Sequence, residues 1–272
     1  MEARLQRRVQ RYGWDLAADV YEALWQAQLA PAQAALLDGA AAAPGESVLD
    51  VACGTGLVAL AAAASVGPAG RVIGVDISGQ MIEVAQRRAQ QLALANVEFA
   101  RMDAEALALP DAGFDAALCA LGLMYMPDPG RALHEMRRAV RPGGRVALAV
   151  WGERSQCGWA PLFGIIDAEV ASDVCPLFFG LGNGDALARL CRATGLQVKS
   201  QQRLSTTLKH ADADDACGAA FAGGPVALAW SRLDDEARVR VRTRYLAATE
   251  PWRVGAGYCI PAEFVVVVAV RP

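Results

Sequence analysis

The sequence predicts an α/β fold in which helices cover both faces of a mostly parallel sheet. Short apolar runs alternate with longer segments whose apolar residues recur at helical spacing, which is the pattern of βαβ units. These runs are almost continuously apolar, as expected for strands buried on both faces. In addition, the glycine-rich turn Cys53-Gly54-Thr55-Gly56 directly follows the first run, in the stretch VLDVACGTGLVA.

The same pattern gives the expected elements in order. Seven strands are expected, at Ser47–Val51, Arg71–Asp76, Val97–Ala100, Phe114–Ala120, Gly144–Trp151, within Val198–Leu208 and at Phe264–Val270. The helices around them are expected at Gly56–Val66, Ser78–Leu94, Gly130–Val140 and Asp185–Thr194. Ser78 would cap its helix by accepting a backbone N–H, and Gly195 would end the last one.

Composition argues against several classes of protein. The formal net charge is −3, whereas a general nucleic-acid binder usually carries a basic excess. No stretch approaches the ~18 uninterrupted apolar residues that a membrane span needs. Seven cysteines without paired spacing, and no signal-peptide pattern, favour a cytoplasmic location. With two histidines and no CxxC motif, no metal site is expected.

The glycine turn and a following acid point to a ligand that contains a nucleoside. Gly54 and Gly56 would let a ligand approach the backbone, where N–H groups at a helix start favour an anionic group. Asp76 lies 20 residues after Gly56, at the end of the next strand, where a carboxylate can accept from both ribose hydroxyls. NAD and S-adenosylmethionine both satisfy these residues, because Gly54–Ala59 also matches the dinucleotide pattern GxGxxA.

Three further features favour S-adenosylmethionine. Asp50 precedes the glycines within the strand, where it would repel a pyrophosphate and attract the ammonium of a methionine moiety. The third strand ends at Met102-Asp103-Ala104, where a carboxylate can accept from the adenine amino group. The fifth strand is introduced by Arg141-Pro142-Gly143-Gly144.

With these residues in view, the chain resembles the class I S-adenosylmethionine-dependent methyltransferases. More narrowly, it is similar to the branch that includes the ubiquinone and menaquinone C-methyltransferases and many natural-product enzymes. The resemblance lies between about Pro44 and Trp151, in the stretches VLDVACGTG, VIGVDISGQMIEVA, MDAEALALP, FDAALCALGLMYMPD and RAVRPGG. It implies a Rossmann-like seven-stranded sheet with helical lid insertions, S-adenosylmethionine as cofactor, and methyltransferase activity.

The resemblance also implies how the cofactor is held. Asp50 and the glycine turn would bind its methionine part, and Asp76 its ribose. Asp103 and Ala104 would meet the adenine edge, while Ile77 and Met81 would pack on the adenine ring. A tyrosine in the helical stretch Ala17–Glu22 would reach the cofactor's carboxylate. The full set of expected cofactor-binding residues is Tyr21, Asp50, Ala52, Gly54, Thr55, Gly56, Asp76, Ile77, Met81, Asp103, Ala104 and Leu121.

Three parts of the chain are expected around this site. Residues 1–43 would form a helical lid, residues 44–151 the cofactor-binding core, and residues 152–272 the rest of the sheet. Two insertions in the last part, at about 155–184 and 212–254, would cover the substrate. Large aromatic residues gather in the lid and the insertions, which suggests a cover over an apolar pocket.

The sequence constrains the methyl acceptor less than the donor. Tyr125 follows the fourth strand, where the transferred methyl should point, so it is the best candidate for a substrate contact; the alternative is core packing. His210 precedes the acidic stretch ADADDA and is a candidate general base at a pocket rim, or else a charged surface group. No catalytic residue is assigned; Tyr125 and His210 are the candidates.

The expected function is therefore methyl transfer to a small apolar or aromatic molecule, at carbon or oxygen, by in-line displacement. Holding nucleophile and methyl about 3 Å apart in line can supply most of the catalysis. Two alternatives stay open: a methyltransferase acting on tRNA or protein, and a non-catalytic partner protein that retains the fold. The oligomeric state stays open between monomer and homodimer.

Overall fold

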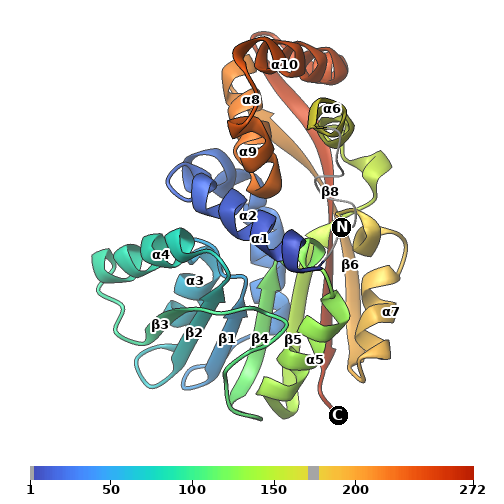
Figure 1. Cartoon of the computed structure of the whole chain (residues 1–272). Coiled ribbons are helices and arrows are strands. Elements are labelled where there is room, and N and C mark those ends of the chain that lie inside the picture. Colours follow the sequence, from blue (N-terminus) through green and yellow to red (C-terminus); the bar gives the residue numbers. More distant parts are fainter. Residues whose placement is uncertain (1–2, 171–177) are drawn as a thin grey trace.

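The computed structural model describes residues 3–170 and 178–272 of the 272-residue chain. Its centre is a sheet with the strand order β3-β2-β1-β4-β5-β8-β6, and a short strand, β7, pairs with β8 (Figure 1). The strands are β1 (Ser47–Val51), β2 (Arg71–Asp76), β3 (Val97–Arg101), β4 (Phe114–Ala120), β5 (Val140–Trp151), β6 (Gln197–His210), β7 (Arg253–Val254) and β8 (Gly257–Val270).

The strand directions confirm the predicted mostly parallel sheet. Strands β1 to β5 pair in parallel with their neighbours, whereas β8 runs antiparallel to both β5 and β6. Strands β6 and β8 extend beyond the rest as a long antiparallel pair, in which His210 lies opposite Tyr258. Because β8 begins at Gly257 and not at Phe264, this pair reaches above the carboxyl ends of the parallel strands (Figure 1).

Helices cover both faces of this sheet. Helix α2 (Tyr21–Ala40) packs with α3 (Leu57–Val66) on one face, and α5 (Pro129–Ala139) packs with α7 (Ala186–Ala193) on the other (Figure 1). Helix α4 (Gly79–Gln91) lies against β2 and β3, and its start is capped by Ser78, whose Oγ accepts the N–H of Met81 at 3.1 Å. The predicted cap is confirmed.

A second group of helices lies above the carboxyl ends of the strands. Helix α1 (Ala3–Ala17) crosses that edge of the sheet, and the other helices of the group gather above it (Figure 1). They are α6 (Pro161–Val170), α8 (Ala213–Phe221), α9 (Gly224–Ser231) and α10 (Asp235–Thr249). Short 3₁₀ turns connect these parts: η1 (Leu123–Tyr125), η2 (Arg154–Gln156), η3 (Gly180–Gly182) and η4 (Glu250–Trp252).

Two observations refine the expected N-terminal lid. The stretch Ala17–Glu22, expected as one helix, contains a break, because α1 ends at Ala17 and α2 begins at Tyr21. The chain turns there from the layer above the sheet to the face of the sheet. In the second half of α2, Leu36 and Ala40 are fully buried, and the helix contacts β4, β5 and β8. Thus α2 belongs to the cover of the sheet, and only α1 lies over its edge.

The three-part division of the chain stays a prediction, and part of the expected insertion at 155–184 lies outside the described residues. Within residues 3–170 and 178–272, no helix is both long enough and apolar enough to span a bilayer.

Candidate active site

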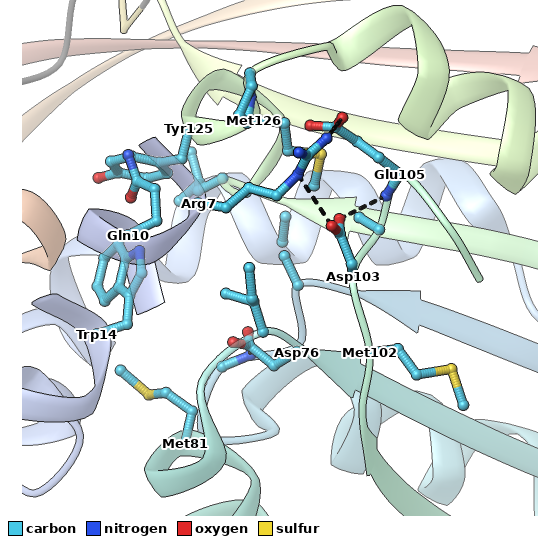
Figure 2. A pocket seen from close by; sticks show the side chains of 18 of the residues that line it. Arg7, Gln10, Trp14, Asp76, Met81, Met102, Asp103, Glu105, Tyr125 and Met126 are labelled. Atoms are coloured by element: carbon cyan, nitrogen blue, oxygen red, sulfur yellow. Dashed lines mark hydrogen bonds and ion pairs between the residues drawn. The ribbon is translucent and has the colours of Figure 1, made fainter. Parts of the chain in front are cut away.

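A cavity opens at the carboxyl ends of β1 to β4, beneath α1; we name it the strand-end cavity (Figure 2). Most of the residues that the sequence predicts for the cofactor lie in its wall. Those that line it are Tyr21, Ala52, Gly54, Asp76, Ile77, Met81, Asp103, Ala104 and Leu121, together with Tyr125.

Asp76, the last residue of β2, is held rigidly at this cavity. The backbone N–H of Gly54 donates to its Oδ2 at 2.9 Å, and that of Ser78 donates to its Oδ1 at 2.8 Å. Burial raises the pKa of the carboxyl group, and these two hydrogen bonds oppose the rise. Each carboxylate oxygen can still accept a second hydrogen bond, so the fixed group can receive a pair of neighbouring hydroxyls.

Asp50 and Thr55 lie in a small adjoining recess, which we name the Asp50 pocket. It shares Tyr21, Ala52 and Gly54 with the strand-end cavity. Asp50 is 1% exposed, and neither of its carboxylate oxygens has a hydrogen-bond partner of normal geometry in the described part of the chain. Thr55 Oγ1 also lacks a partner there. An unsatisfied buried polar group costs about 1–3 kcal/mol, so this arrangement suits a ligand that supplies the missing donors.

The electrostatics of Asp50 favour a cationic donor. Burial raises the pKa of Asp50 to about 8, and the nearby charge of Asp76 adds to the rise, while the backbone N–H of Ala59 opposes it. A positive group in the Asp50 pocket would reverse this effect and restore the carboxylate. The ammonium of an amino-acid ligand has both the charge and the hydrogens that the pocket lacks.

The two glycines of the turn have different roles. Gly54 has φ 54°, and a Cβ built on it would meet no heavy atom within 4 Å, so its bare face borders open space. Gly56 has φ 87°, and a Cβ there would lie 3.0 Å from Phe99 Cζ and 3.2 Å from Ala85 Cβ. Its N–H already donates to the Cys53 carbonyl at 2.9 Å. Gly54 therefore leaves room beside the backbone, whereas Gly56 serves the turn and its packing.

Two non-glycine residues at strand ends have left-handed backbones. Ala52 follows β1 with φ 57°, and Leu121 follows β4 with φ 62°. This conformation costs an L-residue roughly 1–2 kcal/mol. Both residues line the strand-end cavity, so the strain turns the backbone at its wall. The N–H of Leu121 donates to the Ala149 carbonyl at 2.8 Å and is not available to a ligand.

Asp103 is engaged by an arginine that the sequence analysis did not single out. Arg7 of α1 places its Nε 3.0 Å from Asp103 Oδ2, and it also pairs with the buried Glu105 (Figure 2). The other Asp103 oxygen accepts the Glu105 N–H at 2.9 Å. Arg7, Gln10 and Trp14 all line the cavity from α1. Their i, i+3, i+7 spacing is visible in the sequence, but nothing there indicates which face of α1 meets the protein.

A second cavity, the aromatic cavity, adjoins the first and shares Trp14, Tyr21, Leu121 and Tyr125 with it. In the described part of the chain no charged side chain and no histidine lines it. Tyr125 stands between the two cavities, with its ring centroid 5.2 Å from those of both Trp14 and Phe178. The remaining aromatic members of the lining are Trp25, Trp151, Trp159 and Phe163.

Two indole N–H groups of residues that line the aromatic cavity have no partner in the described part of the chain. The Nε1 atoms of Trp25 and Trp159 are buried and have no hydrogen-bond partner among the described residues. Buried indole N–H groups usually have a partner. A bound molecule with an oxygen acceptor would supply one.

His210 does not reach either cavity. It is the last residue of β6, is buried opposite Tyr258, and its Nδ1 lies 3.5 Å from Asp215 Oδ2. Burial lowers the pKa of its imidazole, although the nearby Asp215 opposes this. The expected position at a pocket rim is not observed, because β6 runs further than predicted and pairs with β8 up to this residue.

Comparisons with known proteins agree with this geometry. Residues 48–144 match the family model described as a methyltransferase domain. A 2-phytyl-1,4-naphtoquinone methyltransferase of Synechococcus elongatus is 45% identical over 109 residues, which is 40% of this chain and 47% of that protein. The chain spans about a third to a half of the length of the curated relatives it matches.

Solved structures show the same fold over most of the chain. A protein of Bacillus halodurans C-125 is similar with a TM-score of 0.65 and 19% identity, over 88% of this chain and 98% of that one. The geranyl diphosphate C-methyltransferase of Streptomyces coelicolor A3(2) is similar with a TM-score of 0.55 and 18% identity, over 89% and 79% of the two chains. Residues 48–144 of this chain therefore carry a methyltransferase domain, within a fold that these solved structures share.

Proposed function

We propose that the protein transfers a methyl group from S-adenosylmethionine to a small apolar or aromatic molecule. This molecule also carries an oxygen atom that can accept a hydrogen bond. The observation that carries the proposal is the junction of the two cavities. One cavity has the acids and open backbone that the methyl donor needs, the other is aromatic and uncharged, and Tyr21, Leu121 and Tyr125 line both. A donor and an acceptor bound in them would meet beside these residues.

The described residues fit the methyl donor. Asp50 would pair with its ammonium, Asp76 would accept from its ribose hydroxyls, and Ile77 and Met81 would contact its adenine ring. Asp103 would accept from the adenine amino group with its carboxylate already oriented by Arg7. When bound, S-adenosylmethionine supplies an electrophilic methyl on a sulfonium, which is an excellent leaving group.

The aromatic cavity would position the methyl acceptor and exclude water from it, rather than supply a general acid or base. The described lining has no charged side chain or histidine, and burial raises the pKa of the Tyr21 phenol that lines it. An acceptor that is already nucleophilic, such as an electron-rich ring carbon or a hydroxyl that ionises near neutral pH, therefore fits it best. The indole N–H groups of Trp25 and Trp159 would donate to an oxygen of the acceptor and orient it. Methylation of a prenylated quinone, named in the relative from Synechococcus, is chemistry of this kind.

The test is a methyl-transfer assay with purified protein and methyl-labelled S-adenosylmethionine. The candidate acceptors are 1-naphthol, catechol and reduced 1,4-naphthoquinone, with bulk tRNA and a protein extract as macromolecular alternatives. We expect label in at least one of the three small molecules, found by mass spectrometry as a gain of one methyl group. An Asp76→Ala variant is the control and should lose the activity. Label found only in tRNA or protein would contradict the proposal.

A further inference from the structure

Helix α1 buries polar residues and exposes apolar ones. Gln6 and Gln10, which are 7% and 5% exposed, face the protein. Leu5, Tyr12 and Leu16 are 40%, 44% and 55% exposed on the neighbouring face, where Leu16 also borders a surface hollow lined by α8 and α9. An amphipathic helix in a globular protein ordinarily packs its apolar face against the core, whereas in α1 much of that face lies beside the buried side of the helix and is exposed.

The exposed residues form a continuous stripe. Leu5, Val9, Tyr12 and Leu16 follow the i, i+4, i+7, i+11 spacing of one helix face, with Val9 half-buried. Elsewhere in residues 3–170 and 178–272, Val20 is exposed just beyond the end of α1, and the other exposed large apolar side chains are scattered singly, at Leu92, Val239 and Val254. Scattered residues need no explanation, whereas a stripe on one helix indicates a binding surface.

Arginines flank this stripe along one side. Arg4, Arg8 and Arg11 follow the i, i+4, i+7 spacing, and together with Arg101 they line a surface hollow beside the strand-end cavity. Arg4 and Arg8 make no ion pair within the described part of the chain, and Arg11 lies 3.8 Å from Asp15. The acid in the lining of the hollow, Asp103, is already paired with Arg7.

We propose that this outer face of α1, formed by Leu5, Val9, Tyr12 and Leu16 with Arg4, Arg8 and Arg11, docks on an anionic lipid surface. Helices that lie in a membrane interface combine an apolar face with lysine or arginine beside it. The apolar stripe would insert among the acyl chains, and the arginines would bind the headgroups. A nucleic-acid backbone would match the arginines but would leave the stripe exposed to water.

The position of α1 links this surface to the cavities. Its inner face lines the strand-end cavity through Arg7, Gln10 and Trp14, and Trp14 also lines the aromatic cavity. Docking would therefore bring the aromatic cavity close to the lipid phase, where an apolar acceptor accumulates. The uptake of an apolar acceptor from the lipid rests on the proposed function, whereas the binding of α1 to lipid does not.

The test is sedimentation of the full chain with vesicles. We expect binding to vesicles of phosphatidylcholine mixed with phosphatidylglycerol, weakening as salt is added, and little binding to pure phosphatidylcholine. The double variants Leu5→Ser/Leu16→Ser and Arg4→Gln/Arg8→Gln should each bind roughly tenfold or more weakly. The matched controls, Leu92→Ser/Val254→Ser and Arg232→Gln, change exposed residues elsewhere and should bind like the wild type.

Calorimetry with S-adenosylhomocysteine separates this proposal from the proposed function. All variants should keep the wild-type affinity for that ligand, which shows that they fold. The proposal is overturned if the wild type ignores the anionic vesicles, or if the control variants lose as much binding as the α1 variants. It is also overturned if the outer face of α1 proves to be a self-association surface. In that case the wild type would be a dimer that does not bind vesicles, and the Leu5→Ser/Leu16→Ser variant would be a monomer.

Discussion

Asp50 shows at the scale of one residue how stability and binding conflict in this site. Its carboxyl group is 1% exposed and has no hydrogen-bond partner of normal geometry among the described residues, so the ionised form is disfavoured until a cation arrives. A protein selected for stability alone would place an apolar residue there. The rule that a buried polar group has a hydrogen-bond partner is commonly broken at functional sites.

The pH dependence of stability tests this view of Asp50. Its pKa in the folded protein is raised to about 8, above the value of about 4 for an unfolded chain. The folded state therefore holds the proton more tightly, and the stability that this contributes is lost as pH rises from about 4 through about 8. Without ligand, Asp50→Asn should melt at a higher temperature than the wild type at pH 8, with the difference shrinking at pH 5.

Asp115 provides a matched control for this measurement. Backbone and arginine hydrogen bonds lower the pKa of its carboxyl group, despite partial burial, so Asp115→Asn should not stabilise the protein at pH 8. If Asp50→Asn melts at the wild-type temperature from pH 5 to pH 8, the carboxyl group of Asp50 is not destabilised by burial.

At the scale of elements, polar contacts near both ends of α1 hold this helix over the strand-end cavity, and next to Arg7, Gln6 Nε2 donates to the Tyr125 carbonyl at 3.4 Å. Arg7 pairs with Asp103 and Glu105 at one end. At the other, Ser78 Oγ–H donates to Asp15 Oδ1 at 2.6 Å. Because these ties reach the residues proposed to hold the donor, ligand binding and the ordering of α1 should be coupled.

Hydrogen exchange measures this coupling. Amides in residues 3–30 should exchange more slowly with saturating S-adenosylhomocysteine, because the ligand fills the space beneath α1. Arg7→Ala should speed exchange in α1 without ligand, while the amides of α5 should be unaffected and serve as the internal control. Equal exchange rates with and without ligand would show that α1 does not respond to the cofactor site.

The β6–β8 pair makes His210 a structural residue in this account. It lines neither cavity and is buried at the end of β6 beside Asp215. With an active acceptor identified, His210→Ala should cost less than about tenfold in kcat, below the 10²–10⁴ that removal of a general acid or base typically costs. A loss within that larger range would mean that His210 takes part in proton transfer.

The elements also show what periodicity can and cannot predict. Strands β1, β2 and β4 have the predicted bounds because buried parallel strands are uninterrupted apolar runs. Strand β8 starts seven residues earlier than predicted, since Pro261 and the mixed residues before Phe264 disguise the antiparallel extension. Strand β5 starts at Val140, because Pro142 and Gly143 look like a turn in sequence.

The site residues also fall into those that the sequence could predict and those that it could not. Asp50, Gly54 and Asp76 could be predicted because the carboxyl ends of adjacent parallel strands meet at one edge. Arg7 could not, because a helical period shows that a helix has two faces but not which one packs. The aromatic cavity draws on α2, β5, α6 and α9, so its assembly depends on long-range packing that no local pattern encodes.

At the scale of the whole molecule, the sheet edge, α1 and the upper helices enclose two joined cavities with different chemistry. The strand-end cavity, with the adjoining Asp50 pocket, is polar where Asp76 and Asp50 lie, and the second cavity is aromatic. We infer that the polar part is built for S-adenosylmethionine and not for a dinucleotide, because the buried carboxyl group of Asp50 ionises best beside a cation, which an ammonium group supplies and a pyrophosphate does not.

Isothermal titration calorimetry of the full chain with S-adenosylhomocysteine and with NAD tests that claim most directly. We predict micromolar binding of S-adenosylhomocysteine and no measurable binding of NAD. Asp76→Ala should weaken the first by tenfold or more, since each hydrogen bond to a charged group contributes about 1.5–3 kcal/mol. Asp111→Ala, at a carboxylate that is 75% exposed, is the control and should bind like the wild type. Binding of NAD, with S-adenosylhomocysteine ignored, would contradict the account.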